Sequence, residues 1–142
     1  MRFLFSNSVH NTLPSLGLLA GRIGLGAYML LGHGWGKFME FGERAAKFPD
    51  PLGIGSPASL TGAVFAEVAC SALLAIGLAT RATLLPLIFT MAIAAFVIHG
   101  NDPWFLSKTG GSKEPAMLYL IGYVTLLFTG PGRFSLDEMI GK

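Results

Sequence analysis

The most constraining feature of the sequence is a run without charged residues from Ala82 to Ile98, followed by His99. A bilayer core about 30 Å thick needs roughly 20 apolar residues of helix to cross it, and this run approaches that length. Other apolar segments cover Pro14 to Phe38, Leu60 to Leu78, and Pro115 to Thr129, the last of them short for a full span. The pattern predicts an all-α integral membrane protein, a four-helix bundle with spans near 14–38, 60–78, 82–99 and 115–129.

The composition agrees with a chain that faces lipid. Only 13% of its 142 residues are charged and 52% are hydrophobic, whereas a soluble domain carries about 25% charged residues. Such a chain has too little polar surface to cover a globule in water, so we expect its outer partner to be the lipid bilayer. At this length residues 1–142 are expected to form a single domain. The net charge of +2 is too small to indicate nucleic-acid binding.

The segments between the spans predict two loops on one side and both termini on the other. Residues 39–59 and 100–113 are rich in polar residues, proline and glycine. Thr80 can cap the third helix, and the string from Ser135 to Glu138 fits a capping box, which predicts a short C-terminal interfacial helix. Glycines four residues apart favour close packing between helices inside the bundle. These glycines are Gly17 with Gly21 and Gly32 with Gly36.

Ionisable residues inside apolar spans are costly, and they commonly pair with one another or carry function. They are Arg22, His33 and Lys37 in the first segment, Glu67 in the second, His99 after the third and Glu114 at the fourth. Because a helix turns about 100° per residue, Arg22, His33 and Lys37 should share one face. Arg22 and Glu67 also fall at similar depths, which predicts a buried ion pair between them. The alternative is an Arg22 side chain that reaches the nearer membrane surface.

Several of these residues gather at the end of the bundle that carries the loops. One interpretation is a set of separate interfacial residues beside an aromatic belt formed by Trp35 and Trp104. The functional interpretation is a single polar pocket beneath the loops, with Glu67 at its floor. A pocket of this kind between helices could bind a small redox molecule and transfer protons to and from it.

Metal and thiol chemistry are not favoured by the sequence. Cys70 is the single cysteine, so we expect it to be a buried small hydrophobe rather than a redox or zinc residue. His33 and His99 lie on different helices and could ligate haem, but no second set of ligands accompanies them. We therefore predict no metal site and disfavour haem.

Several strings together resemble the DoxX family of small four-span membrane proteins. They are His33-Gly34-x-x-Lys37-Phe38, Gly77 to Ala82, and Gly130-Pro131-Gly132-Arg133-x-Ser135-Leu136-Asp137, with Arg22, Glu67, His99 and Glu114 in matching places. The similarity covers nearly the whole chain from about Leu16. It implies a multi-pass protein of a bacterial or archaeal plasma membrane with cytoplasmic termini. The Lys and Arg residues are divided too evenly between the two sides to test this orientation.

The resemblance also implies a redox role. The family is named after a subunit associated with thiosulfate:quinone oxidoreduction, and other members are linked to redox stress and quinone detoxification. We therefore expect a membrane redox protein that binds a quinone-like molecule and receives electrons from a soluble or membrane partner protein. The expected catalytic or proton-transfer residues are His33, Lys37, Glu67 and His99, and the expected cofactor-binding residues are Arg22, Trp35 and Glu114.

Two other classes of function stay open at this point. The chain could be a non-catalytic membrane anchor or assembly subunit of a redox complex, in which the ionisable residues only lock the helices together. A small-solute transporter is less favoured because no inverted repeat is evident. The sequence does not decide between an enzyme and a subunit of one, nor between a monomer and a homo-oligomer.

Overall fold

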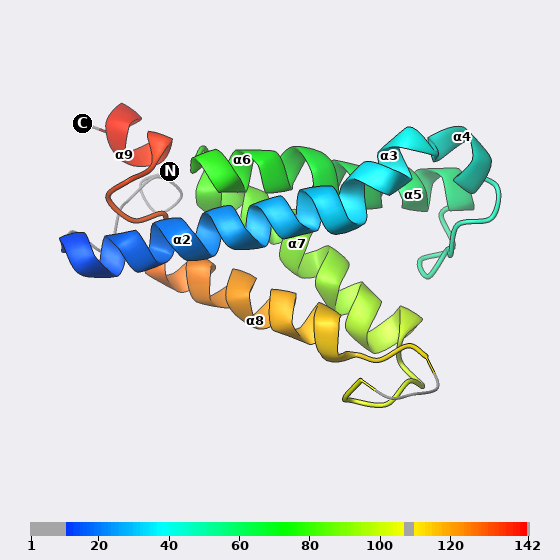
Figure 1. Cartoon of the computed structure of the whole chain (residues 1–142). Helices are drawn as coiled ribbons and strands as arrows, with labels where there is room; N and C mark the ends of the chain where they lie inside the picture. The colour runs from blue at the N-terminus through cyan, green and yellow to red at the C-terminus, as the bar shows by residue number, and fades with distance from the viewer. Residues whose placement is uncertain (1–10, 107–109, 142) are drawn as a thin grey trace.

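The protein is all-α in the computed structural model, which describes residues 11–106 and 110–141. Its main helices form four long runs, and the first three runs each include a π-helical segment, labelled η. The runs are α2 (Thr12–Met29), η1 (Leu30–Gly34) and α3 (Trp35–Met39); α5 (Ser56–Val64), η2 (Phe65–Cys70) and α6 (Ser71–Ile76); α7 (Thr80–Ile93) and η3 (Ala94–Ile98); and α8 (Glu114–Thr129). Two short helices, α4 (Phe41–Arg44) and α9 (Leu136–Ile140), lie at opposite ends of the molecule (Figure 1).

Three of the runs are long and apolar enough to cross a membrane. They comprise 28 residues at Thr12–Met39, 21 at Ser56–Ile76 and 19 at Thr80–Ile98. Helix α8 is apolar but has 16 residues, which corresponds to about 24 Å at 1.5 Å per residue and is shorter than a core of about 30 Å. Large apolar side chains are exposed along the outer faces of these helices, as a lipid-facing bundle requires. They include Tyr28, Leu31, Phe89, Phe96, Leu118 and Phe128.

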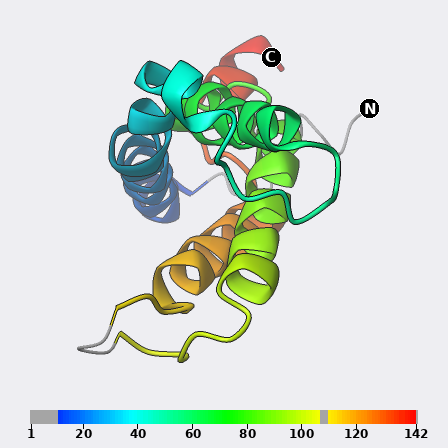
Figure 2. The same cartoon turned by 90° about the vertical axis from the view of Figure 1, so that its right-hand side faces the viewer.

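The core of the bundle lies where α7 packs against α8 and α2 packs against α6. Its centre is formed by fully buried side chains, among them Leu74, Leu84, Leu87 and Tyr123. Cys70 is buried in the same cluster and is a free thiol, as the sequence predicted. Viewed from the loop end, α7 and α8 lie together below the pair formed by α2 and the second run (Figure 2). The two pairs diverge toward this end (Figure 1).

The first and second runs approach closely at two glycines. A Cβ atom at Gly34 would lie 2.7 Å from the Glu67 carbonyl oxygen, and one at Gly26 would lie 2.8 Å from the Ser71 carbonyl oxygen. The prediction of close packing at glycines four residues apart was wrong about the positions, because those glycines lie on other faces of the helix. No heavy atom of the described chain lies within 4 Å of a Cβ built at any of them: Gly17, Gly21, Gly32 and Gly36.

The C-terminal helix α9 caps the third run. The Asp137 carboxylate accepts hydrogen bonds from the backbone N–H groups of Ala79 (2.6 Å) and Thr80 (2.8 Å). The predicted cap by Thr80 is therefore wrong: Thr80 is the first residue of α7, and the cap comes from the far end of the chain. The predicted cap of α9 is confirmed, since the Ser135 hydroxyl accepts from the Glu138 N–H.

Candidate functional site

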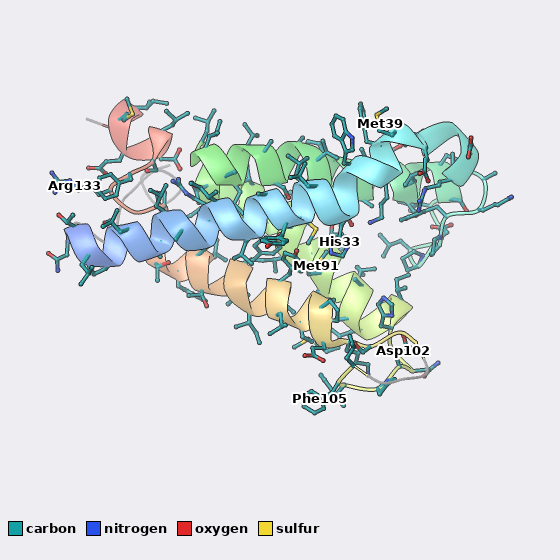
Figure 3. The ribbon with its side chains drawn as sticks, in the orientation of Figure 1. His33, Met39, Met91, Asp102, Phe105 and Arg133 are labelled. Carbon is teal, nitrogen blue, oxygen red and sulfur yellow. The ribbon has the colours of Figure 1, made fainter. Side chains whose placement is uncertain are left out.

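A cavity of about 700 Å³ lies at the loop end of the bundle and carries the central residues of the predicted pocket. Its lining includes His33 and Lys37 from the first run, Glu67 from the second and His99 after the third. The remaining wall is largely apolar and includes Met29, Phe65, Phe89, Met91, Ile98 and Tyr119. Figure 3 shows His33 on the underside of the first run, in the same region as Met91. The structure thus brings together four ionisable side chains that are far apart in the sequence.

The strongest polar contact in the cavity is an ion pair between Lys37 and Glu67. The Lys37 ammonium nitrogen lies 2.5 Å from Glu67 Oε2, with the Glu67 side chain 6% exposed and that of Lys37 20% exposed. Lys37 also donates to the His33 carbonyl oxygen at 3.3 Å. A carboxylate this buried needs a partner charge, because an unpaired buried charge is strongly destabilising. The predicted Arg22–Glu67 pair is therefore wrong: Lys37 is the partner of Glu67.

His33 is held against the aromatic side chains of α8. Its ring meets that of Tyr119 edge to face with centroids 5.6 Å apart, and Tyr119 in turn lies 5.8 Å from Tyr123. Such edge contacts fix the plane of a ring. His33 therefore presents a defined edge to the cavity.

His99 has a carboxylate partner that the sequence analysis missed. Its Nδ1 lies 2.7 Å from Asp102 Oδ2, and Gly111 of the second loop packs onto this pair. When Nδ1 carries the proton and donates to the carboxylate, Nε2 is left as an acceptor. The signal was present in the sequence, since Asp102 follows His99 by three residues in an Asn-Asp-Pro turn. A histidine oriented in this way is suited to exchanging protons.

The three π-helical segments all lie at the level of the cavity. Segment η1 carries His33, η2 carries Glu67, and η3 ends directly before His99. A π-turn bonds i to i+5, occurs mostly as a single-turn bulge inside an α-helix, and is frequent at functional sites. This local geometry is what aims the ionisable groups into one space.

Glu114 lies at the start of α8 and orders the second loop. Its carboxylate accepts a hydrogen bond from the Leu106 N–H at 2.7 Å. It lines a second, smaller cavity of about 460 Å³, to which His33 also contributes. Trp35 is about half exposed and packs against Phe38, with ring centroids 5.8 Å apart. Among the described lining residues of the two cavities, Trp35 is absent.

Arg22 lies near the terminal end of the bundle, away from the cavity. Its side chain is 1% exposed, and Nη2 donates to the Phe134 carbonyl oxygen at 2.6 Å. Within the described chain its Nε and Nη1 have no hydrogen-bond partner, and the Asp137 carboxylate offsets part of the cost of burying its charge. A side chain at Gly77 would overlap the guanidinium. Arg22 therefore anchors the C-terminal segment, and the predicted extension to the nearer membrane surface does not occur either.

Comparison with known proteins assigns the chain to a family. A family model described as DoxX matches residues 17–100. The chain belongs to the DoxX family. An uncharacterized membrane protein of Mycobacterium tuberculosis is 35% identical over 124 residues, which cover 74% of this chain and 75% of the relative. An uncharacterized protein of Haemophilus influenzae is 34% identical over 123 residues, covering 82% and 85%. No solved structure matches the chain.

The family match contains all four ionisable residues of the cavity in this DoxX protein. His33, Lys37, Glu67 and His99 fall within residues 17–100, whereas Glu114 lies beyond them. In the described part of the chain, no group of three or more His, Cys, Asp or Glu side chains is placed to hold a metal ion. The ionisable groups that converge on the cavity therefore include an ammonium, two imidazoles and a carboxylate.

The first loop of the DoxX fold closes over part of the cavity. Phe48, Leu52 and Ile54 contribute to its wall. The loop is held by Asp50, which accepts from the Ser59 hydroxyl at 2.7 Å and from the Gly55 N–H at 2.8 Å. These hydrogen bonds, that of Ser59 first, lower the pKa of the Asp50 carboxyl. The sequence analysis placed the pocket beneath this loop but did not name the loop residues that line it.

Proposed function

We propose that the cavity binds a lipid-soluble, quinone-like molecule and that its ionisable residues exchange protons with this ligand. The observation that carries the proposal is the cavity itself: His33, Lys37, Glu67 and His99 converge on about 700 Å³ of otherwise apolar space at the end of membrane-spanning helices. Ligand pockets are commonly apolar with a few convergent polar groups. A quinone ring suits such a cavity, because its apolar faces pack against apolar side chains and its two carbonyl groups accept hydrogen bonds from the polar ones.

Each polar group has a distinct task in this proposal. A quinone carbonyl accepts hydrogen bonds, and the Lys37 ammonium, the His33 imidazole and a protonated His99 imidazolium can donate them. Reduction of a quinone to its hydroquinone consumes two electrons and two protons. The protons would come from the imidazoles and the Lys37–Glu67 pair, with Asp102 orienting His99. These are general acid–base roles, for which a side chain must reach the reacting oxygen directly or through one water.

The electrons would come from a redox partner protein. The single cysteine, Cys70, is buried and free, and the sequence contains no C-x-x-C pair. The chain would therefore act as the ligand-binding and proton-transferring member of a redox system, either as an oxidoreductase together with its partner or as a subunit of one.

The proposed topology has four spans, with α8 as the fourth and both termini in the cytoplasm. Helix α8 packs along α7, which crosses most of the bundle, and the start of α2 lies at the same end as α9 (Figure 1). This topology places the cavity near the outer face of a bacterial plasma membrane. Polar groups at the mouth of the cavity would then exchange protons with the outer aqueous phase.

The test is binding of 2-methyl-1,4-naphthoquinone to the full chain in phosphatidylcholine nanodiscs, together with analysis of a solvent extract of the purified protein. We expect saturable binding that falls at least about tenfold in a His33→Ala, His99→Ala double variant. Exposed surface variants such as Lys47→Ala should bind like the native chain. A quinone-free extract together with no saturable binding of the added quinone would contradict the proposal.

A second candidate, a non-catalytic assembly subunit, is favoured by one patch on the second loop. Trp104, Phe105 and Leu106 are all more than half exposed, and Lys113 lies over the Trp104 ring at 4.7 Å. An apolar patch outside the helical runs suits a protein contact. If this candidate is right, Phe105→Asp abolishes co-purification of a partner protein while binding of the quinone probe is absent in native and variant chains alike.

A further inference from the structure

The second cavity forms a groove on the side of the bundle, between α2 and α8. We call it the lateral groove. It has a volume of about 460 Å³, and its own lining comes from Gly24, Leu25 and Tyr28 on α2 and from Glu114 and Leu118 on α8. Apart from the Glu114 carboxylate, which is engaged by the Leu106 N–H, these lining residues offer mainly apolar surface.

The lateral groove adjoins the main cavity. His33, Leu106, Pro115 and Tyr119 line both spaces. The edge-to-face contact of His33 and Tyr119 therefore lies on the border between them. A ligand in the main cavity that extended past this contact would enter the groove.

The groove faces the lipid side of the bundle. Tyr28 is 76% exposed and Leu118 is 62% exposed, and both lie on outer faces of membrane helices. Leu31 and Ile121 continue these exposed apolar faces on the same two runs. Since lipid acyl chains are the surroundings of such faces, the groove opens toward the bilayer beside the main cavity.

We propose that the lateral groove is a binding subsite for the apolar tail of an amphipathic lipid whose polar ring occupies the main cavity. This inference rests on the proposed function and adds the ligand class: a ring with a long hydrocarbon tail rather than a small soluble quinone. The division of chemistry supports it, because the ionisable groups converge in the cavity and the apolar surface continues through the groove. The four lining residues that the two spaces share favour a tail of the same ligand over an unrelated partner helix.

The test exploits two glycines of α2. No heavy atom of the described chain lies within 4 Å of a Cβ at Gly24 or at Gly17, so both accept a side chain without collision. Gly24 lines the groove. Gly17 lies seven residues earlier, on nearly the same face of the helix at about 100° per residue, and is outside the groove. Gly24→Leu fills the subsite, and Gly17→Leu is its matched control.

The probes are 2-methyl-1,4-naphthoquinone and the same ring with a four-unit isoprenoid tail, measured in phosphatidylcholine nanodiscs at equal mole fractions relative to lipid. We expect Gly24→Leu to weaken binding of the tailed probe at least about tenfold and that of the tail-less probe less than about twofold. Gly17→Leu should change neither. Retained binding of the tail-less probe also reports that the variant is folded.

Three results would overturn the inference. One is equal weakening of both probes by Gly24→Leu, and another is unchanged binding of both. The third is a changed oligomeric state in Gly24→Leu without altered probe selectivity, which would assign the groove to a second copy of the chain. Absence of tail-less binding to the native chain would instead contradict the proposed function, so the two failures are distinguishable.

Discussion

Lys37 and Glu67 join the first two runs through an ion pair of 2.5 Å at the floor of the cavity. Beside this pair, Gly34 lets the first run touch the backbone of Glu67 itself. Backbone contact and side-chain pairing therefore fix the same point of the bundle. The close packing of the first two runs therefore positions the same Lys37–Glu67 pair that takes part in the proposed proton transfer.

The ion pair should show strong coupling in a double-mutant cycle. We expect Glu67→Gln or Lys37→Met alone to lower the free energy of unfolding by about 2 kcal/mol, below the range for a fully buried pair because Lys37 remains partly exposed. The combined variant should lose less than the sum of the two, since neither charge is then left unpaired. Unfolding in mixed micelles measures all four proteins. Additive losses would show that the pair contributes no coupling.

Gly34→Ala should separate the first two runs. Its Cβ would lie 2.7 Å from a backbone oxygen that cannot rotate away, so we expect a loss of about 1–3 kcal/mol from overpacking. Gly36→Ala is the matched control, because its Cβ meets no described heavy atom within 4 Å and alanine favours helix over glycine by about 1 kcal/mol. The midpoint temperature of thermal unfolding should therefore fall in Gly34→Ala and rise in Gly36→Ala. A shift of both variants in the same direction would contradict the packing described.

Asp102 should act through the orientation of His99. Asp102→Ala removes the acceptor at His99 Nδ1, and we expect it to weaken binding of the tail-less quinone probe about threefold to tenfold through loss of a fixed ring orientation. Asp102→Asn retains an acceptor oxygen and should restore most of the affinity. Equal effects of the two variants would mean that orientation of His99 does not matter for binding.

The roof of the cavity should loosen when Asp50 is protonated. Because hydrogen bonds lower the pKa of Asp50, its contribution is full above the ordinary carboxyl pKa of about 3.9 and is lost as the pH falls through the lower native value. We expect hydrogen-exchange protection of the Ile54 and Gly55 amides to be constant from about pH 5 to 8 and to fall below about pH 4. Asp50→Asn should reduce this protection severalfold at neutral pH, and Asp102→Asn should not.

The proposed topology predicts opposite labelling of the two ends. In a Cys70→Ala background, Gly42→Cys lies in a helix at the loop end and Gly141→Cys follows α9. A membrane-impermeant maleimide should label Gly42→Cys in intact cells and Gly141→Cys only after lysis. The reverse labelling pattern would show that the orientation is the opposite of the one proposed. Labelling of both cysteines in intact cells would contradict the four-span topology.

The convergence of His33, Lys37, Glu67 and His99 was predictable because span ends and loop positions follow from apolar segment lengths. The partner of Glu67 was not, because the prediction compared only the depths of Arg22 and Glu67, whereas the first run contacts Glu67 at Gly34, three residues from Lys37. The cap from Asp137 depends on tertiary placement of the C-terminal segment, whereas the pairing of Asp102 with His99 is local and was overlooked in the sequence. Segment hydropathy carries no information on either.

The bonds of the C-terminal segment impose an order on the biogenesis of this protein. Arg22 is an early residue of the first span, yet its hydrogen-bond acceptor is the carbonyl of Phe134, and the start of α7 is capped by Asp137. Membrane helices enter the bilayer while the ribosome is still elongating the chain. The first and third helices must therefore insert with these groups unsatisfied until residues 134–137 have been synthesised. A chain cut after Thr129 would retain every long helix and still be unable to complete the bundle.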